Sequence, residues 1–272
     1  TQSATSLIQS TTNTGNVRLS AATSVTVGDI ESTSATVGIL AGTGSILDAD
    51  ALVSGVNDTD LDVSASKLMM TADMAIGATT NHLETSVGTL TTLSSNGSTF
   101  ITESDAVTID TVSISVKRVA ITGITSAISE ASQSDLTANN GNNIVLNSGA
   151  LLDVGSNKVL ATQFTLTASG SVGAIDNALN TQVDQLTLTA TGDVWMSEVD
   201  ALVLNGVTAS NKQVSLVVGG ALSDTASTQV QSSGLSMNVS GDVGTSSNAL
   251  NTQVDQLTLT ATGDVWMSEV DA

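Results

Sequence analysis

The chain has 272 residues, a formal net charge of −20, one His, and neither Cys nor Pro. Without cysteine it can form no disulfide framework, no thiolate metal site and no cysteine nucleophile. Six basic residues against 26 acidic ones argue against binding to a nucleic-acid phosphate backbone. No apolar run is long enough to form a transmembrane segment.

Short segments of alternating apolar and small polar residues recur along the whole chain, and each ends at Gly or a small polar residue. In the segment 186–192, Leu186, Leu188 and Ala190 alternate with threonines, which is the period-2 pattern of a half-buried strand. Successive copies end about 24 residues apart on average. In chain order the predicted strands are 18–23, 40–44, 68–73, 94–97, 119–123, 144–149, 164–170, 186–192, 214–220, 235–241 and 257–263.

A period of about 24 residues with only strand signals predicts an all-β fold, a parallel β-solenoid of about 11 turns. The absence of Pro agrees, because in such a stack nearly every strand N–H donates to a neighbouring turn. We favour a right-handed β-helix, because turns this irregular lack the strict hexapeptide spacing of left-handed ones. Arrays of β-sandwich domains are the rival fold, but they need units of roughly 100 residues.

A longer repeat lies above this period. Residues 177–201 and 248–272 are identical over 25 positions at an offset of 71, and 81–106 is a diverged copy. Because 71 residues make three turns, we expect residues 1–272 to form a single continuous solenoid repeat region. The last copy stops where the earlier one continues at Leu202. An uncapped solenoid edge pairs with other chains, so we expect a segment of a longer protein.

An acidic signature of the form [DE]-x-D-A begins at Asp48, Glu103, Glu198 and Glu269. Because the solenoid turns that contain it are the longer ones, it predicts an extra bend or short loop that recurs along one side of the solenoid. The main expectation for these residues is a set of solvated acidic corners, which keep the solenoid soluble and block pairing at its edges.

The same acids are weak candidates for a calcium site. Residues two apart in a strand point to the same side, so Glu198 can converge with Asp200 and Glu103 with Asp105, with Asp193 one bend away. Calcium needs six to eight oxygen ligands. The sequence contains neither an EF-hand loop nor the glycine-rich calcium nonapeptide. Calcium is therefore the secondary interpretation, and no other cofactor or metal is expected.

Paired carboxylates also carry out glycoside hydrolysis, and some β-helices are polysaccharide-degrading enzymes. Here the acids recur at every long turn, whereas a catalytic pair stands once in one groove. The basic residues that would hold acidic sugars are scattered, apart from the adjacent pair Lys117 and Arg118. The sequence therefore predicts a protein that is not an enzyme and has no catalytic or cofactor-binding residue. A polysaccharide-acting β-helix enzyme remains a third alternative.

The segment 177–210, NALNTQVDQLTLTATGDVWMSEVDALVLNGVTAS, followed by VSLVVGG, resembles filamentous-haemagglutinin-like repeats. Such repeats occur in very large bacterial exported proteins and surface adhesins. As a pattern the resemblance covers most of the chain, and 177–272 most clearly. It implies a right-handed parallel β-helix in an extracellular or cell-surface setting.

Two functional hypotheses follow from the repeats and the resemblance. In the first, the chain is a structural module of an extracellular bacterial filament, stalk or surface fibre. It would associate with itself end-to-end or laterally, or continue into more of the same chain. In the second, it is an adhesin module that binds a host, a neighbouring cell or a like filament through a lateral face. A non-repeating insertion or an exposed apolar patch would favour the second. The sequence shows only modest irregularity, around Lys117–Arg118 and 131–143, and favours the first.

Overall fold

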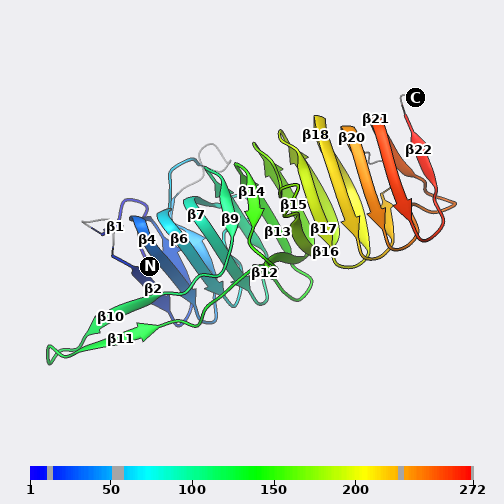
Figure 1. The fold of residues 1–272 in the computed structure, drawn as a ribbon. Coiled ribbons are helices and arrows are strands. Elements are labelled where there is room, and N and C mark those ends of the chain that lie inside the picture. The colour runs from blue at the N-terminus through cyan, green and yellow to red at the C-terminus, as the bar shows by residue number, and fades with distance from the viewer. Residues whose placement is uncertain (11–14, 51–57, 226–229, 271–272) are drawn as a thin grey trace. The chain divides into compact units, whose positions relative to one another are not determined.

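The computed structural model describes residues 1–10, 15–50, 58–225 and 230–270. Its described residues contain no helix, and parallel strands stack into a β-solenoid of about 11 turns, about 22 residues apart (Figure 1). The predicted fold class is therefore confirmed, and the turns are slightly shorter than the 24 residues expected. Among the described strands, every pair outside one hairpin (residues 115–129) is parallel, because each strand pairs with a strand in a neighbouring turn and the chain runs in the same direction in both.

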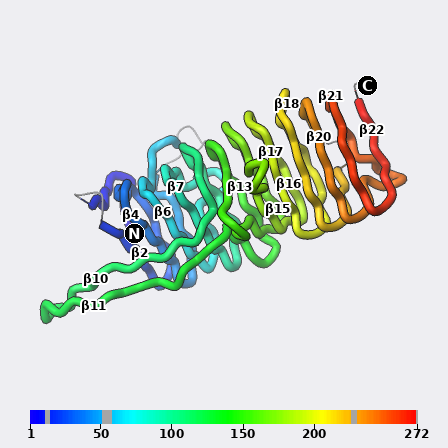
Figure 2. Tube along the Cα trace, viewed as in Figure 1, coloured from blue at the N-terminus to red at the C-terminus, as the bar shows by residue number. Residues whose placement is uncertain are grey.

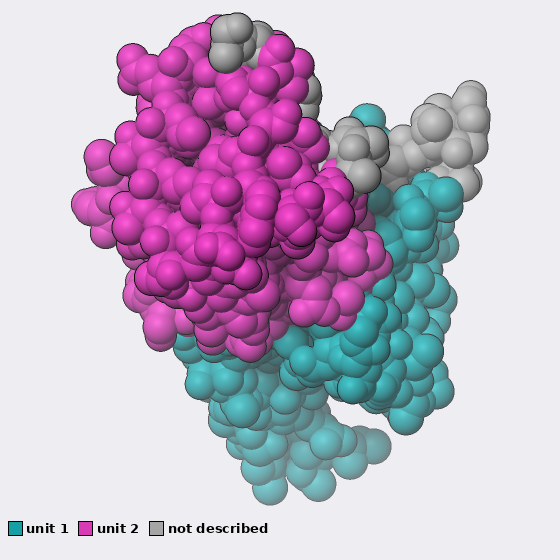
Figure 3. All heavy atoms as spheres, turned by 90° about the vertical axis from the view of Figure 1, so that its right-hand side faces the viewer, with its two compact units in different colours: residues 1–142 teal, residues 143–272 magenta. Residues whose placement is uncertain are grey.

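The chain divides into two compact units, residues 1–142 and 143–272, which Figure 3 shows in different colours. The strands of the first unit are β1 Leu7–Gln9, β2 Val17–Ala21, β3 Val25–Val27, β4 Asp29–Ala41, β5 Ile46–Asp48, β6 Val63–Ala72, β7 Leu83–Ser94, β8 Thr99–Glu103, β9 Val107–Ile109, β10 Ser115–Val119, β11 Thr125–Ser129 and β12 Leu136–Ala138. The strands of the second unit are β13 Asn143–Ser148, β14 Leu151–Asp153, β15 Lys158–Ala168, β16 Leu179–Ala190, β17 Val194–Glu198, β18 Leu202–Val218, β19 Leu222–Asp224, β20 Val230–Val239, β21 Leu250–Ala261 and β22 Met267–Glu269.

In the first unit the ladder β2–β4–β6–β7 stacks one apolar column through successive turns. Val17 pairs with Val37, Val37 with Leu68, and Leu68 with Leu90. The last three of these side chains are fully buried. Because side chains alternate along a strand, the column on the inner side stays aliphatic while the residues between its members face outward. The core of this unit is thus a set of axial aliphatic columns.

The second unit repeats this arrangement with nearly constant spacing. Ile144, Phe164, Leu186 and Leu204 pair in sequence across β13, β15, β16 and β18, and all four are buried. In β16 the buried leucines alternate with outward-facing threonines, which confirms the period-2 pattern. Figure 2 shows these strands as stacked, nearly parallel coils. Each aliphatic side chain that is fully buried in this way contributes roughly 1.5–3 kcal/mol to the free energy of folding.

One predicted strand lies in a different kind of structure. The segment 119–123 was expected to close a solenoid turn at Gly123, but Gly123 lies in the connection between β10 and β11, with φ +79°. These two strands form an antiparallel hairpin in which Val116 pairs with Ile128 (Figures 1 and 2). A strand followed by Gly is a signal that hairpins and solenoid corners share, since both need a tight turn. The sequence pattern could not separate the two.

The hairpin is anchored on the outer side of the first unit. Ile114 and Val112, which precede β10, pack against Met69 of β6, and Val116 lies against this cluster. Met69 is therefore buried although it points away from the aliphatic interior. A Cβ on Gly38 would lie only 3.0 Å from Ile114, so the glycine leaves room for the incoming chain.

A repeated glycine turn precedes three of the long strands, β7, β16 and β21. Its three copies share a φ between +66° and +68°. At each, an added Cβ would lie 2.2–2.3 Å from the backbone oxygen of an aromatic residue in the next turn. Only glycine fits both the dihedral angle and the space. The pairs are Gly77 with Phe100, Gly173 with Trp195, and Gly244 with Trp266.

Candidate functional site

Glu103, one of the five calcium candidates, ends β8 and is only 3% exposed. Its carboxylate accepts hydrogen bonds from Thr85 Oγ1 at 2.7 Å, from Val87 N at 3.1 Å and from Asp105 N at 3.1 Å. Burial raises the pKa of Glu103 to about 7, and these three donors oppose the rise. The carboxylate therefore accepts hydrogen bonds from backbone N–H groups at and beside its own bend.

Glu198 does the same at the end of β17, where it is also 3% exposed. It accepts hydrogen bonds from Val183 N at 3.1 Å, Val199 N at 2.8 Å and Asp200 N at 3.3 Å. Burial raises the pKa of this carboxyl above its ordinary value. The expectation of solvated corners is thus wrong for both glutamates, because the bend leaves backbone N–H groups that a buried carboxylate satisfies.

Of the other three candidates, Asp105 and Asp200 lie at these bends, and Asp193 lies at the opposite end of β17. Asp105 and Asp200 are exposed, and Asp105 Oδ2 accepts a hydrogen bond from Ser86 Oγ at 3.0 Å. Asp193 Oδ1 accepts one from Gln213 N at 2.9 Å. Within the described part of the chain, none of the five candidates belongs to a group of three acids with ligand atoms close enough to share an ion. Asp271, in the fourth copy of the signature, lies outside the described residues.

A second repeated acid, not singled out by the sequence, stands at the end of the short strands β14 and β19. Asp153 accepts hydrogen bonds from Asn177 Nδ2 at 2.9 Å, from Asn180 Nδ2 at 2.6 Å and from Asn180 N at 3.0 Å. Two amides and a backbone N–H therefore satisfy a buried carboxylate. The same network recurs at Asp224, with Asn248 and Asn251 as donors.

Asp48 is the first copy of this second network. It ends β5, and its Oδ2 accepts a hydrogen bond from Asn81 Nδ2 at 2.6 Å, as Asp153 accepts one from Asn177. The sequence pattern had grouped Asp48 with the bend glutamates, and this alignment is wrong. The residues from Asp48 match the D-x-D-A signature. However, Asp48 ends the short strand β5, which occupies the same place in its turn as β14, the strand that ends at Asp153. Ala51, the last residue of that pattern, lies outside the described residues.

Around Asp48 the amide network is replaced by carboxylates. Glu84 stands three residues after the first asparagine, where the other two copies carry a second asparagine. Asp62 is 1% exposed and its Oδ2 accepts a hydrogen bond from Glu84 N at 2.8 Å. Ligand atoms of Asp48, Asp50 and Asp62 lie within 4.8 Å of one another, and so do those of Asp48, Asp58 and Glu84. We call these five residues the acidic cluster.

The electrostatics of the acidic cluster are unfavourable for five free carboxylates. Burial, reinforced by the neighbouring charges of Asp48 and Glu84, raises the pKa of Asp62 to about 10. Burial is also the largest cause of the raised pKa of Asp48 and of Asp50, and repulsion from nearby aspartates adds to it. The sequence carries one signal of this cluster. Glu84 stands at the repeat position that Asn180 and Asn251 occupy in the other two copies.

The hairpin β10–β11 presents a second, different surface. Val119 and Ile124 are exposed and Ile121 is fully exposed, so the tip of the hairpin is apolar. Lys117 and Arg118, also exposed, stand directly before this tip on a chain with a net charge of −20. The irregular region noted in the sequence is thus a non-repeating insertion with an apolar end and two positive charges.

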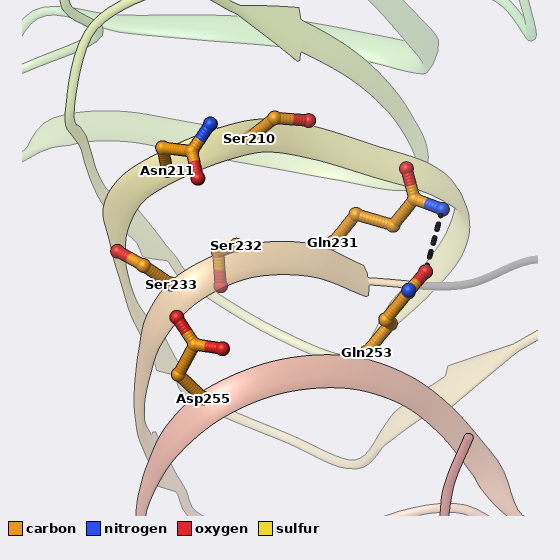
Figure 4. A pocket seen from close by; sticks show the side chains of 7 residues that line it. All are labelled: Ser210, Asn211, Gln231, Ser232, Ser233, Gln253 and Asp255. Atoms are coloured by element: carbon orange, nitrogen blue, oxygen red, sulfur yellow. Dashed lines mark hydrogen bonds between the residues drawn. The ribbon is translucent and has the colours of Figure 1, made fainter. Parts of the chain in front are cut away.

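The second unit carries a shallow polar hollow between the outer faces of β18, β20 and β21 (Figure 4). Its walls include Ser210, Asn211 and Asp255, and Gln231 Nε2 donates to Gln253 Oε1 at 3.1 Å. Asp255 is the only titratable side chain among the residues that line it.

No family model matches this chain, and no curated protein or solved structure is similar to it at a significant level. Among the described residues, no helix is long and apolar enough to cross a membrane. The function must therefore be argued from the geometry of the chain itself.

Proposed function

We propose that the chain is a structural β-solenoid module of an extracellular bacterial filament, stalk or surface fibre, and that it has no catalytic role. The observation that supports this is the parallel ladder within each unit, which continues past local register shifts, with its axial aliphatic columns. In such a stack each turn contacts only its neighbours, so turns can be added without redesigning the rest. Resemblance to filamentous-haemagglutinin-like repeats supports the setting.

Immunoelectron microscopy on intact cells of the producing organism tests this function. Antibodies against the chain should label fibres outside the envelope without permeabilisation, and mild protease treatment of intact cells should remove the label. Label that appears only after permeabilisation would contradict the proposal. A matched antibody against a cytoplasmic protein serves as the control for cell integrity.

A second function, adhesion, is favoured by one specific observation. The hairpin β10–β11 is a non-repeating insertion whose tip exposes Val119, Ile121 and Ile124. Singly exposed apolar residues are common, but several on one projecting element are typical of a contact surface. In this proposal the solenoid holds the hairpin out, and the hairpin binds a host surface, a neighbouring cell or a like filament.

A shortened hairpin tests adhesion without disturbing the base. Replacing residues 117–127 by Asn-Gly joins Val116 to Ile128, which are already paired, through a two-residue turn that suits a hairpin. Beads coated with the wild-type chain should adhere to cell monolayers or to one another, and beads with the shortened chain should lose most of this adhesion. Equal adhesion by both would remove the hairpin from the function.

A further inference from the structure

The amide networks at Asp153 and Asp224 provide an internal reference for the acidic cluster. In both, every donor around the carboxylate comes from the chain, and two asparagines supply the side-chain donors. A carboxylate placed at this corner is therefore stable when amide donors surround it. In the acidic cluster one of the two asparagines is replaced by Glu84, which brings a further negative charge.

The lost donors are not replaced by basic side chains. The one ion pair among the described residues, Arg18 with Glu130, lies elsewhere in the first unit. The segment 51–57, which follows Asp50 in the sequence, contains no Lys, Arg or His. Five carboxylates thus gather at one corner without a positive side chain to balance them.

Two buried oxygens in the acidic cluster point independently to a ligand. Asp62 is 1% exposed and its Oδ1 accepts no hydrogen bond from a donor of the chain, although its carboxyl shares a proton with that of Asp48 when one is bound. Asp58 is 8% exposed and its Oδ2 accepts no hydrogen bond either. An unpartnered, buried carboxylate oxygen costs several kcal/mol unless a cation or a proton compensates it. Each of these aspartates belongs to one of the two groups whose ligand atoms lie within 4.8 Å, and Asp48 belongs to both.

We propose that Asp48, Asp50, Asp58, Asp62 and Glu84 bind Ca²⁺. Calcium takes six to eight oxygen ligands in flexible geometry, and five carboxylates that each bind through one or two oxygens supply that number. Magnesium keeps several waters and prefers fewer protein carboxylates, and zinc prefers nitrogen and sulfur ligands.

Bound calcium would fasten successive turns of the first unit to one another. Asp48 ends β5, Asp62 precedes β6, and Glu84 lies in β7, so an ion held by Asp48 and Asp62, or by Asp48 and Glu84, would join side chains from different turns of the stack. Calcium should therefore stabilise the folded chain by binding only its native state. This inference rests on the acidic cluster alone and is independent of the proposed structural and adhesive functions.

The test uses the full chain, stripped with EDTA and dialysed. Isothermal titration with CaCl₂ should give saturable binding, and Ca²⁺ at about 100 times its Kd should raise the melting temperature by about 5–10 °C. EDTA should reverse the rise. MgCl₂ at the same concentration should give a clearly smaller rise.

The variant Asp62→Asn/Glu84→Asn replaces two carboxyl groups of the acidic cluster with amides, so that the cluster resembles the amide networks at Asp153 and Asp224. It should lose calcium binding at least tenfold and, in EDTA, melt above the wild type because amide groups replace two crowded, buried carboxyl groups. The variant Asp193→Asn/Asp200→Asn replaces the same number of carboxyl groups, on either side of β17 in the second unit, and should bind calcium as the wild type does.

Three results would overturn the proposal. They are the absence of saturable calcium binding by the wild type, equal shifts with Ca²⁺ and Mg²⁺, and undiminished binding by Asp62→Asn/Glu84→Asn. Should that variant fail to fold, the wild-type titration and the single variant Asp50→Asn, which should bind calcium more weakly, decide the matter.

Discussion

At the scale of single residues, this solenoid depends on groups that the repeat brings to the same place in each turn. Glycines with positive φ let one turn approach the next, and buried glutamates satisfy the backbone where a strand bends. Both roles follow from local geometry, since a tight corner leaves neither space for a Cβ nor partners for every N–H. Two predictions belong to this scale.

The first prediction separates crowding from backbone strain at the glycine corner. Gly173→Ala should lower the free energy of unfolding by about 3 kcal/mol, because it combines a positive φ with a Cβ 2.2 Å from Trp195 O. Gly155 has nearly the same φ of +67° but open space around it, so Gly155→Ala should cost only about 1 kcal/mol. Urea unfolding of both variants measures the difference, and equal costs would contradict the crowding argument.

The second prediction concerns pH. The pKa of Glu103 is raised to about 7 in the folded state, so between about pH 4.5 and 7 the folded chain binds more protons than the unfolded one. The contribution of Glu103 to stability must therefore fall as pH rises through this window and level off above it. Across this pH window, the free energy of unfolding of the wild type should fall by up to about 3 kcal/mol relative to that of Glu103→Gln. Urea unfolding at each pH measures the difference. Asp176→Asn, at an exposed carboxylate, should run parallel to the wild type.

At the scale of elements, the hairpin is the one described pair of strands that departs from the parallel ladder. Its base is held by Ile114 and Val112 against Met69, whereas its tip lies in solvent. An element anchored through one small apolar cluster can be released without unfolding the solenoid beneath it. A prediction at this scale follows from the anchor.

Ile114→Ala should cost about 2–4 kcal/mol at the anchor and expose the hairpin to protease, because it leaves a cavity beside Met69. Limited proteolysis should then cut within 115–129 at least tenfold faster, while circular dichroism of the solenoid changes little. Ile121→Ala, at a fully exposed side chain, should leave both the cleavage rate and the stability unchanged. Similar cleavage of the two variants would show that the cluster does not anchor the hairpin.

At the scale of the whole molecule, the stack can be lengthened by whole turns. The 71-residue offset between the identical segments makes residues 177–247 a natural insert, since a second copy placed after Ser247 continues the sequence of the repeat at both junctions. Each added turn buries its columns on the turn before it. The surface that unfolding exposes therefore grows in proportion to the number of turns.

The chain with this insert should unfold with a total m-value about a quarter larger than that of the wild type, because m follows the surface exposed on unfolding and 71 residues are added to 272. Inserting only residues 177–236 at the same place breaks the register, since a one-residue slip already reverses which side chains face inward. That control should unfold at lower urea or aggregate. Equal behaviour of the two inserts would contradict the repeat of three turns.

Much of this architecture was predicted from the sequence. Alternation such as Leu186, Leu188 and Ala190 reports which side chains face inward, and Gly at a regular interval reports where the chain turns, so the all-β solenoid and its count of turns follow from local patterns. The segment ending at Gly123 was misassigned for the same reason, because a hairpin and a solenoid corner share their local signal.

The acidic cluster was decided only by the tertiary structure. Asp48, Asp62 and Glu84 lie in successive turns, and the lengths of the connections between them set the register that brings their carboxylates together. Local pattern instead grouped Asp48 with the bend glutamates. The repeat therefore determines the ladder residue by residue, whereas contacts between turns decide which acids are satisfied by amides and which require a cation. This division holds because alternation acts within a strand, while electrostatic balance depends on every group that packs around a buried charge.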